Sequence, residues 1–316
     1  MPCYHPLPGW YAKRANDKTR KRPVVFTFGE GFKDRKAEIP CGRCIGCRLE
    51  KARQWAARCV HESQLHQRNC FLTLTYNQGS VPEVKSSIDG TSLPSLRPRD
   101  FTLFMKRLRE RYGAGIRFFQ CGEYGDQLGR PHHHVLLFGH DFDDKRRLCG
   151  KADAHALYES DQLNELWPHG FASIGRLTFE SAGYTVRYAL KKIGGKPAEA
   201  HYQGRVPEYA TMSRRPGIGT EWLRKYAADV YPRGEVVIQG RRMKPPRFYN
   251  DKYPQLAERD NEKKTRQRNV EMLRRENRKA RNRDTNATGK RLLVREEVKQ
   301  AQVRTLSRNL EGTTTK

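Results

Sequence analysis

The sequence has no apolar run that could cross a membrane, because no window approaches the ~18 consecutive apolar residues that a spanning helix needs. Residues 1–10 also lack the apolar stretch of roughly 7–15 residues found in secretory signal peptides. None of the Gly-Lys pairs has a glycine five positions earlier, so the phosphate-binding P-loop is missing. These absences predict a soluble, cytoplasmic protein and exclude an ATP-driven helicase or motor.

Acidic residues are scarce for the length of the chain. In 316 residues, 35 Asp and Glu stand against 62 Lys and Arg, a formal net charge of +27. Such an excess attracts polyanions over long range and says nothing about the fold. We therefore expect nucleic acid to be the partner.

Aromatic residues are almost absent from residues 251–316, where Tyr253 stands alone among 19 Lys or Arg and 10 Asp or Glu. This composition predicts a basic tail, helical or disordered, that builds no core; it is either a solvated segment or an arm that follows a nucleic-acid backbone. We divide the chain into residues 1–69 (a cysteine cluster and a helix), 70–250 (the central domain with an extension) and 251–316 (the tail).

Hydrophobic periodicity predicts a mixture of helices and strands. Helices are expected over residues 49–67, 100–113, 161–167 and 182–193, and strands over residues 71–76, 115–121, 132–138 and 171–177. Asp100 is expected to cap the second helix, and a turn-rich segment over residues 122–131 predicts a hairpin. The order favours an α+β fold with an antiparallel sheet and flanking helices.

Three consecutive histidines stand in one of these strands. Successive side chains of a strand alternate faces, so His132 and His134 share one face and His133 lies on the other. Two imidazoles on one face can chelate a metal ion, and hairpin pairing brings Glu123 toward them as a third ligand. The alternative is that these histidines are ordinary surface or core residues.

The expected helix over residues 182–193 carries two tyrosines one turn apart, Tyr184 and Tyr188. Val186 and the other aliphatic residues gather on one side, so the tyrosines are expected on the opposite side and not as core residues. Three cations flank them: Arg187, Lys191 and Lys192. A tyrosine hydroxyl, with a free pKa of about 10, becomes a nucleophile when a nearby cation or metal favours the phenolate. Phosphoryl transfer needs little more than such a nucleophile and a Lewis acid, here Mg²⁺ or Mn²⁺.

Cys41, Cys44 and Cys47 are spaced as metal ligands often are. A structural Zn²⁺ would need a fourth ligand, for which Cys3 is our assignment and Cys59 and Cys70 are alternatives. Ordinary buried thiols remain the other explanation.

Basic residues are interleaved with aromatic ones between residues 187 and 249. Arg214, Arg215, Arg241 and Arg242, with Arg187 and Lys192, are candidates for DNA contact. The aromatic residues among them are Trp222, Tyr226, Tyr231 and Tyr249. They would either stack on single-stranded DNA or form core beneath surface charges.

Several of these segments together resemble the HUH single-strand endonucleases, which initiate rolling-circle replication. Residues 71–76 are similar to the first motif of that family, Pro131-His132-His133-His134 to its paired-histidine motif, and Tyr184-x-x-x-Tyr188-x-x-Lys191 to the two-tyrosine form of its third. Segments 41–47 and 212–219 look similar to replication initiators of microviruses, especially the gokushovirus type. One departure is His133, since the residue between the paired histidines is usually bulky and apolar.

The resemblance implies an RRM-like endonuclease domain within residues 70–250 and a specific reaction cycle. A tyrosine attacks a phosphate of single-stranded DNA, becomes linked to the 5′ end and releases a 3′-OH that primes synthesis. The second tyrosine cuts the next junction and permits ligation, and Lys191 helps to orient the attacking tyrosine. The implied partners are a single-stranded or supercoiled circular origin and the host replication machinery, in the bacterial cytoplasm.

Two other functions fit parts of the sequence. A non-catalytic, zinc-stabilised nucleic-acid-binding protein accounts for the charge and the cysteines, but leaves the histidine and tyrosine pairs unexplained. An iron oxygenase accounts for two histidines and a carboxylate, but not for the tyrosines or the net charge.

Overall fold

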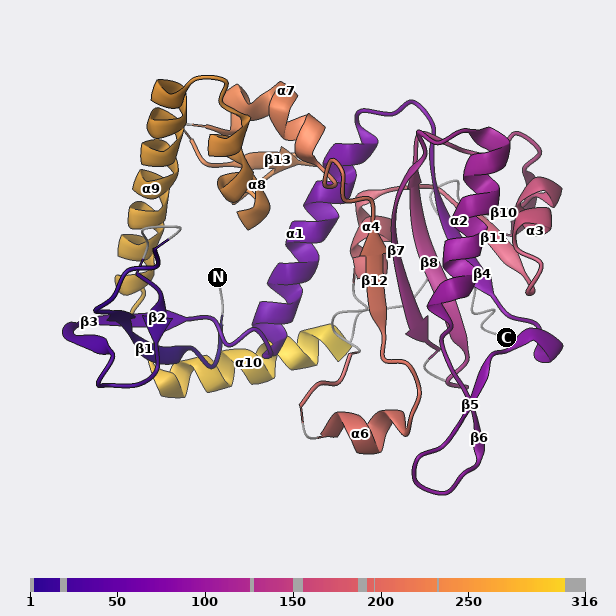
Figure 1. Ribbon diagram of the computed structural model, residues 1–316, viewed down its shortest axis with the longest axis horizontal. Helices are drawn as coiled ribbons and strands as arrows, with labels where there is room; N and C mark the ends of the chain where they lie inside the picture. The colour runs from indigo at the N-terminus through magenta and orange to yellow at the C-terminus, as the bar shows by residue number, and fades with distance from the viewer. Residues whose placement is uncertain are drawn as a thin grey trace. The chain divides into compact units, whose positions relative to one another are not determined.

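The protein is described from a computed structural model (Figure 1). The description covers residues 3–17, 22–125, 128–149, 156–186, 192–195, 197–231 and 233–304. By internal contacts the chain divides into two compact units, one formed by Met1–Lys51 with Glu276–Ser307 and one that contains Ala52–Arg275. Within the described ranges, no helix is both long and apolar enough to cross a membrane.

The larger unit is built on a seven-stranded sheet in the order β12-β7-β8-β4-β11-β10-β9. Its strands are β4 (Asn69–Thr75), β7 (Arg117–Tyr124), β8 (Pro131–Phe138), β9 (Arg146–Cys149), β10 (Leu157–Glu159), β11 (Ala172–Gly175) and β12 (Tyr209–Met212). All of these neighbours pair antiparallel. The predicted α+β fold with an antiparallel sheet is confirmed, as is the hairpin of β7 and β8.

One face of this sheet is covered by α2 (Pro98–Tyr112) and α3 (Asp161–Leu166), as Figure 1 shows. The apolar side chains of α2 fall at helical spacing and pack on alternate residues of β4 and β8, with Trp167 fully buried among them. From α2 these are Phe101, Phe104, Met105 and Leu108, and from the strands Leu72, Leu74, Val135 and Leu137. Burial of each such side chain stabilises the fold by roughly 1.5–3 kcal/mol.

The other face carries residues of α1 (Ile45–Ser63) and α4 (Phe179–Val186). Ala56 and Cys59 of α1 pack with Phe119, Leu136 and Phe138, which point away from α2 because strand side chains alternate. The expected helix over residues 49–67 therefore exists, but it begins earlier, at Ile45, and ends at Ser63. The sheet is buried on both faces.

Asp100 does not cap α2, contrary to expectation. The helix begins at Pro98, whose fixed φ suits a first helical position, and Asp100 lies inside the first turn. Both carboxylate oxygens of Asp100 lie 2.9 Å from Nε of Arg97. The predicted end of the helix is confirmed, since Gly113 follows it with a φ of 101° that favours glycine.

The extension that follows β12 has a core of its own. Its elements are α7 (Thr220–Val230), β13 (Val236–Ile238), β14 (Arg241–Met243), α8 (Arg247–Lys252) and the short 3-10 helix η3 (Tyr253–Leu256), whereas α6 (Pro197–Tyr202) precedes β12. Trp222, Tyr231 and Tyr249 are buried there with Leu223. The suggestion that these aromatic side chains stack on DNA is wrong for these three, since they form core; Tyr226 packs partly buried beside them.

The smaller unit holds a three-stranded antiparallel sheet in the order β2-β1-β3. Its elements are β1 (Leu7–Ala12), β2 (Val24–Val25), β3 (Gly31–Ile39) and α10 (Gly289–Arg304). The remaining elements of the chain are η1 (Gln78–Ser80), the hairpin of β5 (Glu83–Lys85) and β6 (Ser92–Pro94), and α9 (Asp260–Asn282).

The predicted tail is helical in its described part, but the expectation that it adds nothing to a core is wrong. Val270 of α9 is buried with Trp222, and Leu292 of α10 is buried with Tyr4 and Cys44. The thin apolar stripes of α9 and α10 are enough to bury these side chains, because each helix covers only one small cluster of apolar residues.

Candidate active site

The hairpin of β7 and β8 brings three metal-ligating side chains together. Glu123 pairs in register with His132, and Cys121 with His134, so the carboxylate and both imidazoles meet on one face. Oε1 of Glu123 lies 3.1 Å from Nε2 of His132 and 3.2 Å from Nε2 of His134. The three potential ligand atoms lie within 4.8 Å of one another, which is the spacing predicted for ligands of a single ion.

The other ring nitrogen of each histidine is held by the protein. Nδ1 of His132 lies 3.2 Å from the carbonyl oxygen of Arg130, which only accepts, so Nδ1 is the donor. Nδ1 of His134 lies 3.1 Å from Oγ1 of Thr73 on the neighbouring strand β4. Such partners orient metal-binding imidazoles and fix their tautomers. Both Nε2 atoms therefore face the carboxylate, and the donor set fits a divalent cation.

Burial and charge make Glu123 a strong ligand. The exposed fractions of Glu123, His132 and His134 are 3%, 9% and 1%. Burial alone would raise the pKa of the Glu123 carboxyl, but the two imidazoles hold that pKa well below its usual range. Glu123 is therefore ionised at neutral pH and supplies the negative charge that a cation site needs.

Tyr184 of α4 lies beside this triad. Its ring packs edge to face against His134, with centroids 4.9 Å apart and planes at 80°. Tyr184 is buried in the same apolar cluster as Ala182 and Val186. The expected division of the helix into an apolar side and a tyrosine side is wrong here, because α4 is buried on more than one side.

The other residues of the tyrosine motif cannot be placed against this triad. Tyr188, Lys191 and Arg187 lie outside the described residues. Lys192 is described and exposed.

A buried polar chain runs behind the triad on the α2 face of the sheet. Tyr76 Oη lies 3.0 Å from Oδ2 of Asp100 and 3.2 Å from Nε2 of His133. Burial lowers the pKa of His133 to about 3, so the ring is neutral. The Tyr76 hydroxyl donates its one hydrogen to the carboxylate and accepts from His133, which fixes the tautomer of His133.

His133 is thus held by a hydrogen bond to Tyr76 on the α2 face of the sheet. Sequence reasoning missed the roles of Tyr76, Asp100 and Thr73. Strand alternation was the available signal, because it puts Thr73 on the face of β4 that His134 shares. The partners of these side chains could not be predicted, because they depend on packing between distant segments.

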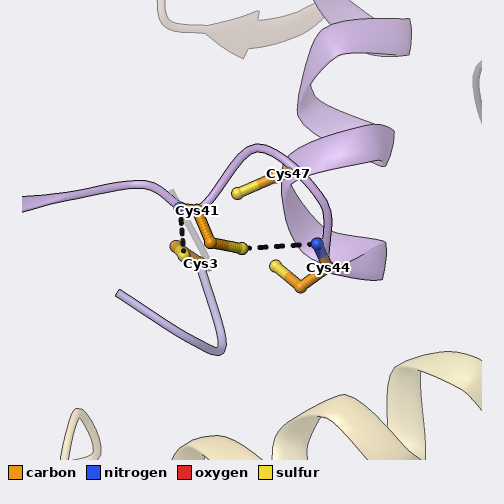
Figure 2. A group of neighbouring side chains, drawn as sticks. All are labelled: Cys3, Cys41, Cys44 and Cys47. Atoms are coloured by element: carbon orange, nitrogen blue, oxygen red, sulfur yellow. Dashed lines mark hydrogen bonds between the residues drawn. The ribbon is translucent and has the colours of Figure 1, made fainter. Parts of the chain in front are cut away.

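Four cysteines converge in the smaller unit (Figure 2). Cys3 precedes β1, Cys41 follows β3, and Cys44 and Cys47 lie at the start of α1. Their sulfur atoms lie within 4.8 Å of one another. The structure thus brings Cys3 to the cluster, whereas Cys59 and Cys70 are buried in two other apolar clusters.

Backbone amides point at these sulfur atoms. The amide of Cys41 lies 3.2 Å from Sγ of Cys3, and the amide of Cys44 lies 3.4 Å from Sγ of Cys41. Burial would raise the pKa of the Cys41 thiol, but amides of Cys44 and Arg43 help to lower it to about 7. A thiolate stabilised in this way suits Zn²⁺, whereas burial raises the pKa of the Cys3 and Cys47 thiols.

The candidate DNA-contacting arginines that the structure describes are exposed. Arg214 and Arg215 follow β12 in a loop whose backbone is anchored: Ile218 O accepts from Nε of Arg58 at 2.9 Å, and the Gly219 amide donates to Glu62 at 2.6 Å. Arg241 and Arg242 are exposed on β14, and Arg242 lies 3.8 Å from Glu235.

Comparison with known proteins identifies the family. The model for replication-associated protein ORF2/G2P matches residues 69–193, which contain the triad and Tyr184. Replication-associated protein VP4 of Bdellovibrio phage phiMH2K is 36% identical over 225 residues, or 68% of this chain and 67% of the relative. This chain belongs to the family of phage replication-associated proteins.

Two further relatives of this phage replication-associated protein agree. Replication-associated protein ORF2 of Spiroplasma virus 4 is 32% identical over 67% of this chain and 66% of the relative. Replication-associated protein ORF4 of Chlamydia phage 1 is 28% identical over 71% of this chain and 55% of the relative. No solved structure matches. The resemblance to microvirus-type initiators, drawn from the motifs, is confirmed at the level of the family.

Proposed function

We propose that this phage replication-associated protein initiates rolling-circle replication by nicking single-stranded DNA with a tyrosine. The observation that carries the proposal is the buried Glu123–His132–His134 triad with the Tyr184 ring packed against it. A carboxylate and two imidazoles next to a phenol are the parts that a metal-assisted phosphoryl transfer requires.

In this mechanism Tyr184 Oη attacks the scissile phosphorus and the P–O3′ bond breaks. The phosphate stays on the tyrosine as a 5′-phosphotyrosine, the 3′ oxygen leaves with a proton as a free 3′-OH, and the phenol gives up its proton. Glu123, His132 and His134 would hold Mg²⁺ or Mn²⁺, which supplies Lewis acidity and orients the phosphate. Thr73 and Arg130 keep both Nε2 atoms directed at that position.

Tyr188 and Lys191 complete the proposed cycle by their place in the sequence motif. Tyr188 would make the second cut. The new 3′-OH that this cut releases would then attack the first phosphotyrosine, form the P–O3′ bond that closes a circle, and release Tyr184. Lys191 would favour the phenolate by its charge. The proposed substrate is a single-stranded or supercoiled circular origin in the host cytoplasm, where the host machinery extends the 3′-OH.

Six basic side chains are proposed to neutralise the DNA backbone. Arg187 and Lys192 stand near the tyrosines in the sequence. Arg214 and Arg215 lie on the anchored loop, and Arg241 and Arg242 lie on β14.

We also propose that Cys3, Cys41, Cys44 and Cys47 bind a structural Zn²⁺. Four sulfur atoms within 4.8 Å and two amide–sulfur hydrogen bonds between cluster members support the assignment. Purified protein should contain close to one zinc ion per chain, and a Cys44→Ser variant should lose it and melt at a lower temperature. Elemental analysis that finds no zinc in freshly purified, chelator-free protein would contradict this site.

Nicking is tested with circular single-stranded DNA and the purified protein, with and without Mn²⁺. We expect linear product whose 3′ end is extended by a polymerase, and no product with the Tyr184→Phe/Tyr188→Phe double variant or after chelation. Tyr226→Phe, a partly buried tyrosine of another cluster, is the control and should nick normally. DNA binding without nicking by wild-type protein on the cognate origin would favour the non-catalytic binder.

A further inference from the structure

Two phenylalanines of the smaller unit are unusually exposed. Phe26 and Phe28 follow β2 and have exposed fractions of 56% and 52%. Phe28 is held in place by Trp10 of β1, whose ring meets it edge to face with centroids 5.3 Å apart. A contiguous patch of exposed apolar side chains marks an interaction surface in soluble proteins.

Cations lie over the rings of the same sheet. Nζ of Lys33 is 5.4 Å from the ring centre of Phe28. The guanidinium carbons of Arg22 and Arg35 are 5.1 and 4.9 Å from the ring centre of Phe32 on β3. We call Trp10, Phe26, Phe28 and Phe32, with Arg22, Lys33 and Arg35, the aromatic–basic surface.

The charge of this part of the chain has one sign. Residues 13–36 contain nine Lys or Arg and three Asp or Glu, an excess of six positive charges in a short segment. The centre of a patch that binds another protein is depleted in Lys, although Arg is enriched there. Exposed rings among cations instead match surfaces that stack nucleic-acid bases while neutralising the backbone.

We propose that the aromatic–basic surface binds single-stranded DNA by base stacking, as a second binding surface separate from the nicking site. The inference rests on the proposed function for its substrate class. A single strand is favoured over a duplex because stacking on a protein ring needs an unpaired base face. The surface would hold the DNA strand and so raise the local concentration of DNA at the nicking site.

The cysteine cluster gives this surface a firm support. Leu7 and Ile39 pair at one end of the sheet, with Cys3 shortly before β1 and Cys41 shortly after β3. A zinc ion shared by these cysteines would tie the ends of β1 and β3 together.

The test is fluorescence anisotropy of the full-length, zinc-loaded protein with oligothymidine and with a duplex, each of about 20 nucleotides per strand. The Phe26→Ala/Phe28→Ala variant should bind the single strand at least about tenfold more weakly and the duplex within about twofold of wild type. Phe26→Tyr/Phe28→Tyr keeps the rings and should restore single-strand affinity. Ile88→Ala, an exposed apolar position in the other unit, should change neither affinity.

Melting temperatures establish that the variants are folded, and both affected side chains are exposed enough to leave stability unchanged. Single-strand affinity within about twofold of wild type in the Ala variant would overturn the proposal. An equal loss of affinity for duplex and single strand would also overturn it. A change of oligomeric state in sedimentation would do the same, because the surface would then be an interface between copies of the chain.

Nicking at saturating DNA separates this proposal from the proposed function. We expect the Ala variant to nick at the wild-type rate once DNA is saturating, because the Glu123 triad and Tyr184 are unchanged. Wild-type protein that binds the single strand through Phe26 and Phe28 but never nicks would refute the nickase and leave the binding surface standing. Normal nicking with unchanged affinity would refute only the surface.

Discussion

At the scale of single residues, the metal-binding geometry depends on the side chains that hold the ligands. Thr73 contacts Nδ1 of His134 from the neighbouring strand, and the Arg130 carbonyl does the same for His132. These partners determine which nitrogen of each ring is available. Their removal should therefore weaken the binding of a metal ion although every ligand stays in place.

Thr73→Val keeps the shape of the side chain and removes the hydroxyl. We expect the affinity for Mn²⁺ to fall by about 10- to 100-fold, because the hydroxyl that orients His134 is gone. Titration followed by electron paramagnetic resonance of free Mn²⁺ measures this directly. Thr102→Val on α2, where the hydroxyl contacts only Pro98 O in the described structure, is the matched control. Equal affinities for all three proteins would contradict the role of Thr73.

Acid should destabilise the protein through buried histidines. His61 stacks on Trp222 with ring centres 3.6 Å apart, and its Nδ1 lies 2.8 Å from Tyr249 Oη. Burial lowers the pKa of His61 from 6.5 to about 3. Between these values the unfolded chain binds the proton and the folded chain does not, so stability falls as pH falls from 6.5 toward 3.

One such group contributes a slope of up to about 1.4 kcal/mol per pH unit. His61→Gln should flatten the loss of unfolding free energy between pH 7 and pH 5, measured by urea denaturation. Arg58 and Glu62 stay in place in this variant, so the comparison isolates His61. His201→Gln, at an exposed position, should keep the wild-type slope. An unchanged slope in His61→Gln would show that this histidine titrates normally.

Sequence reasoning reached the triad because its signal is local. Alternation along a strand puts His132 and His134 on one face, and hairpin pairing adds Glu123. The same reasoning misplaced Tyr184, since a helical wheel contains only the residues of its own helix. It does not show that the sheet covers the tyrosine side as well.

At the scale of elements, the end of β4 is fixed by a very close backbone contact. A Cβ at Gly170 would lie 2.3 Å from the Asn77 amide nitrogen and 2.7 Å from the Thr75 carbonyl oxygen. Thr75 pairs with His132 across the sheet. The segment after α3 therefore packs directly on the strand that supports the metal ligands.

Gly170→Ala should lower the unfolding free energy by about 1–3 kcal/mol and weaken Mn²⁺ binding, because two stretches of backbone must separate. Gly79→Ala, where the nearest atom to an added Cβ is a side-chain oxygen at 3.9 Å, should change either quantity little. Thermal melting and Mn²⁺ titration provide both measurements. Equal behaviour of the two variants would mean that the backbone at Gly170 relaxes freely.

The central strands and the flanking helices of the larger unit were predictable, whereas β9, β10, β12 and the elements from α7 to α8 were not predicted. The hairpin was clear because two alternating strands flank a turn-rich segment. The starts of helices were less accurate: Asp100 is a good capping residue, but Pro98 is a better first helical residue, and the carboxylate is used by Arg97 and Tyr76 instead. The order of the seven strands depends on long-range pairing that no local pattern reveals.

At the scale of the whole molecule, the net charge of +27 should dominate affinity for DNA. The tail was expected to stay outside any core, yet Val270 and Leu292 are buried. Composition gives the average polarity of a segment, whereas a single apolar side chain is enough to cover a small apolar cluster. Most side chains of α9 and α10 are nevertheless exposed, so their positive charges remain available to DNA.

Binding of single-stranded DNA should weaken linearly with the logarithm of salt concentration. Arg214→Gln/Arg215→Gln should reduce the slope by about 0.7 for each phosphate that the variant no longer neutralises. Anisotropy at several salt concentrations measures the slope, and Lys290→Gln in α10 is a comparison at another exposed basic position. A double variant with the wild-type slope would mean that the anchored loop does not touch the DNA backbone.

The most direct test of the account is to identify the residue that becomes linked to DNA. Wild-type protein is incubated with origin single strands and Mn²⁺, denatured, digested with nuclease and protease, and analysed by mass spectrometry. The account predicts a nucleotide joined through its 5′ phosphate to Tyr184 or Tyr188, absent without the metal and absent in Glu123→Ala. Cleaved DNA with no adduct, or a link at any other residue, would contradict it.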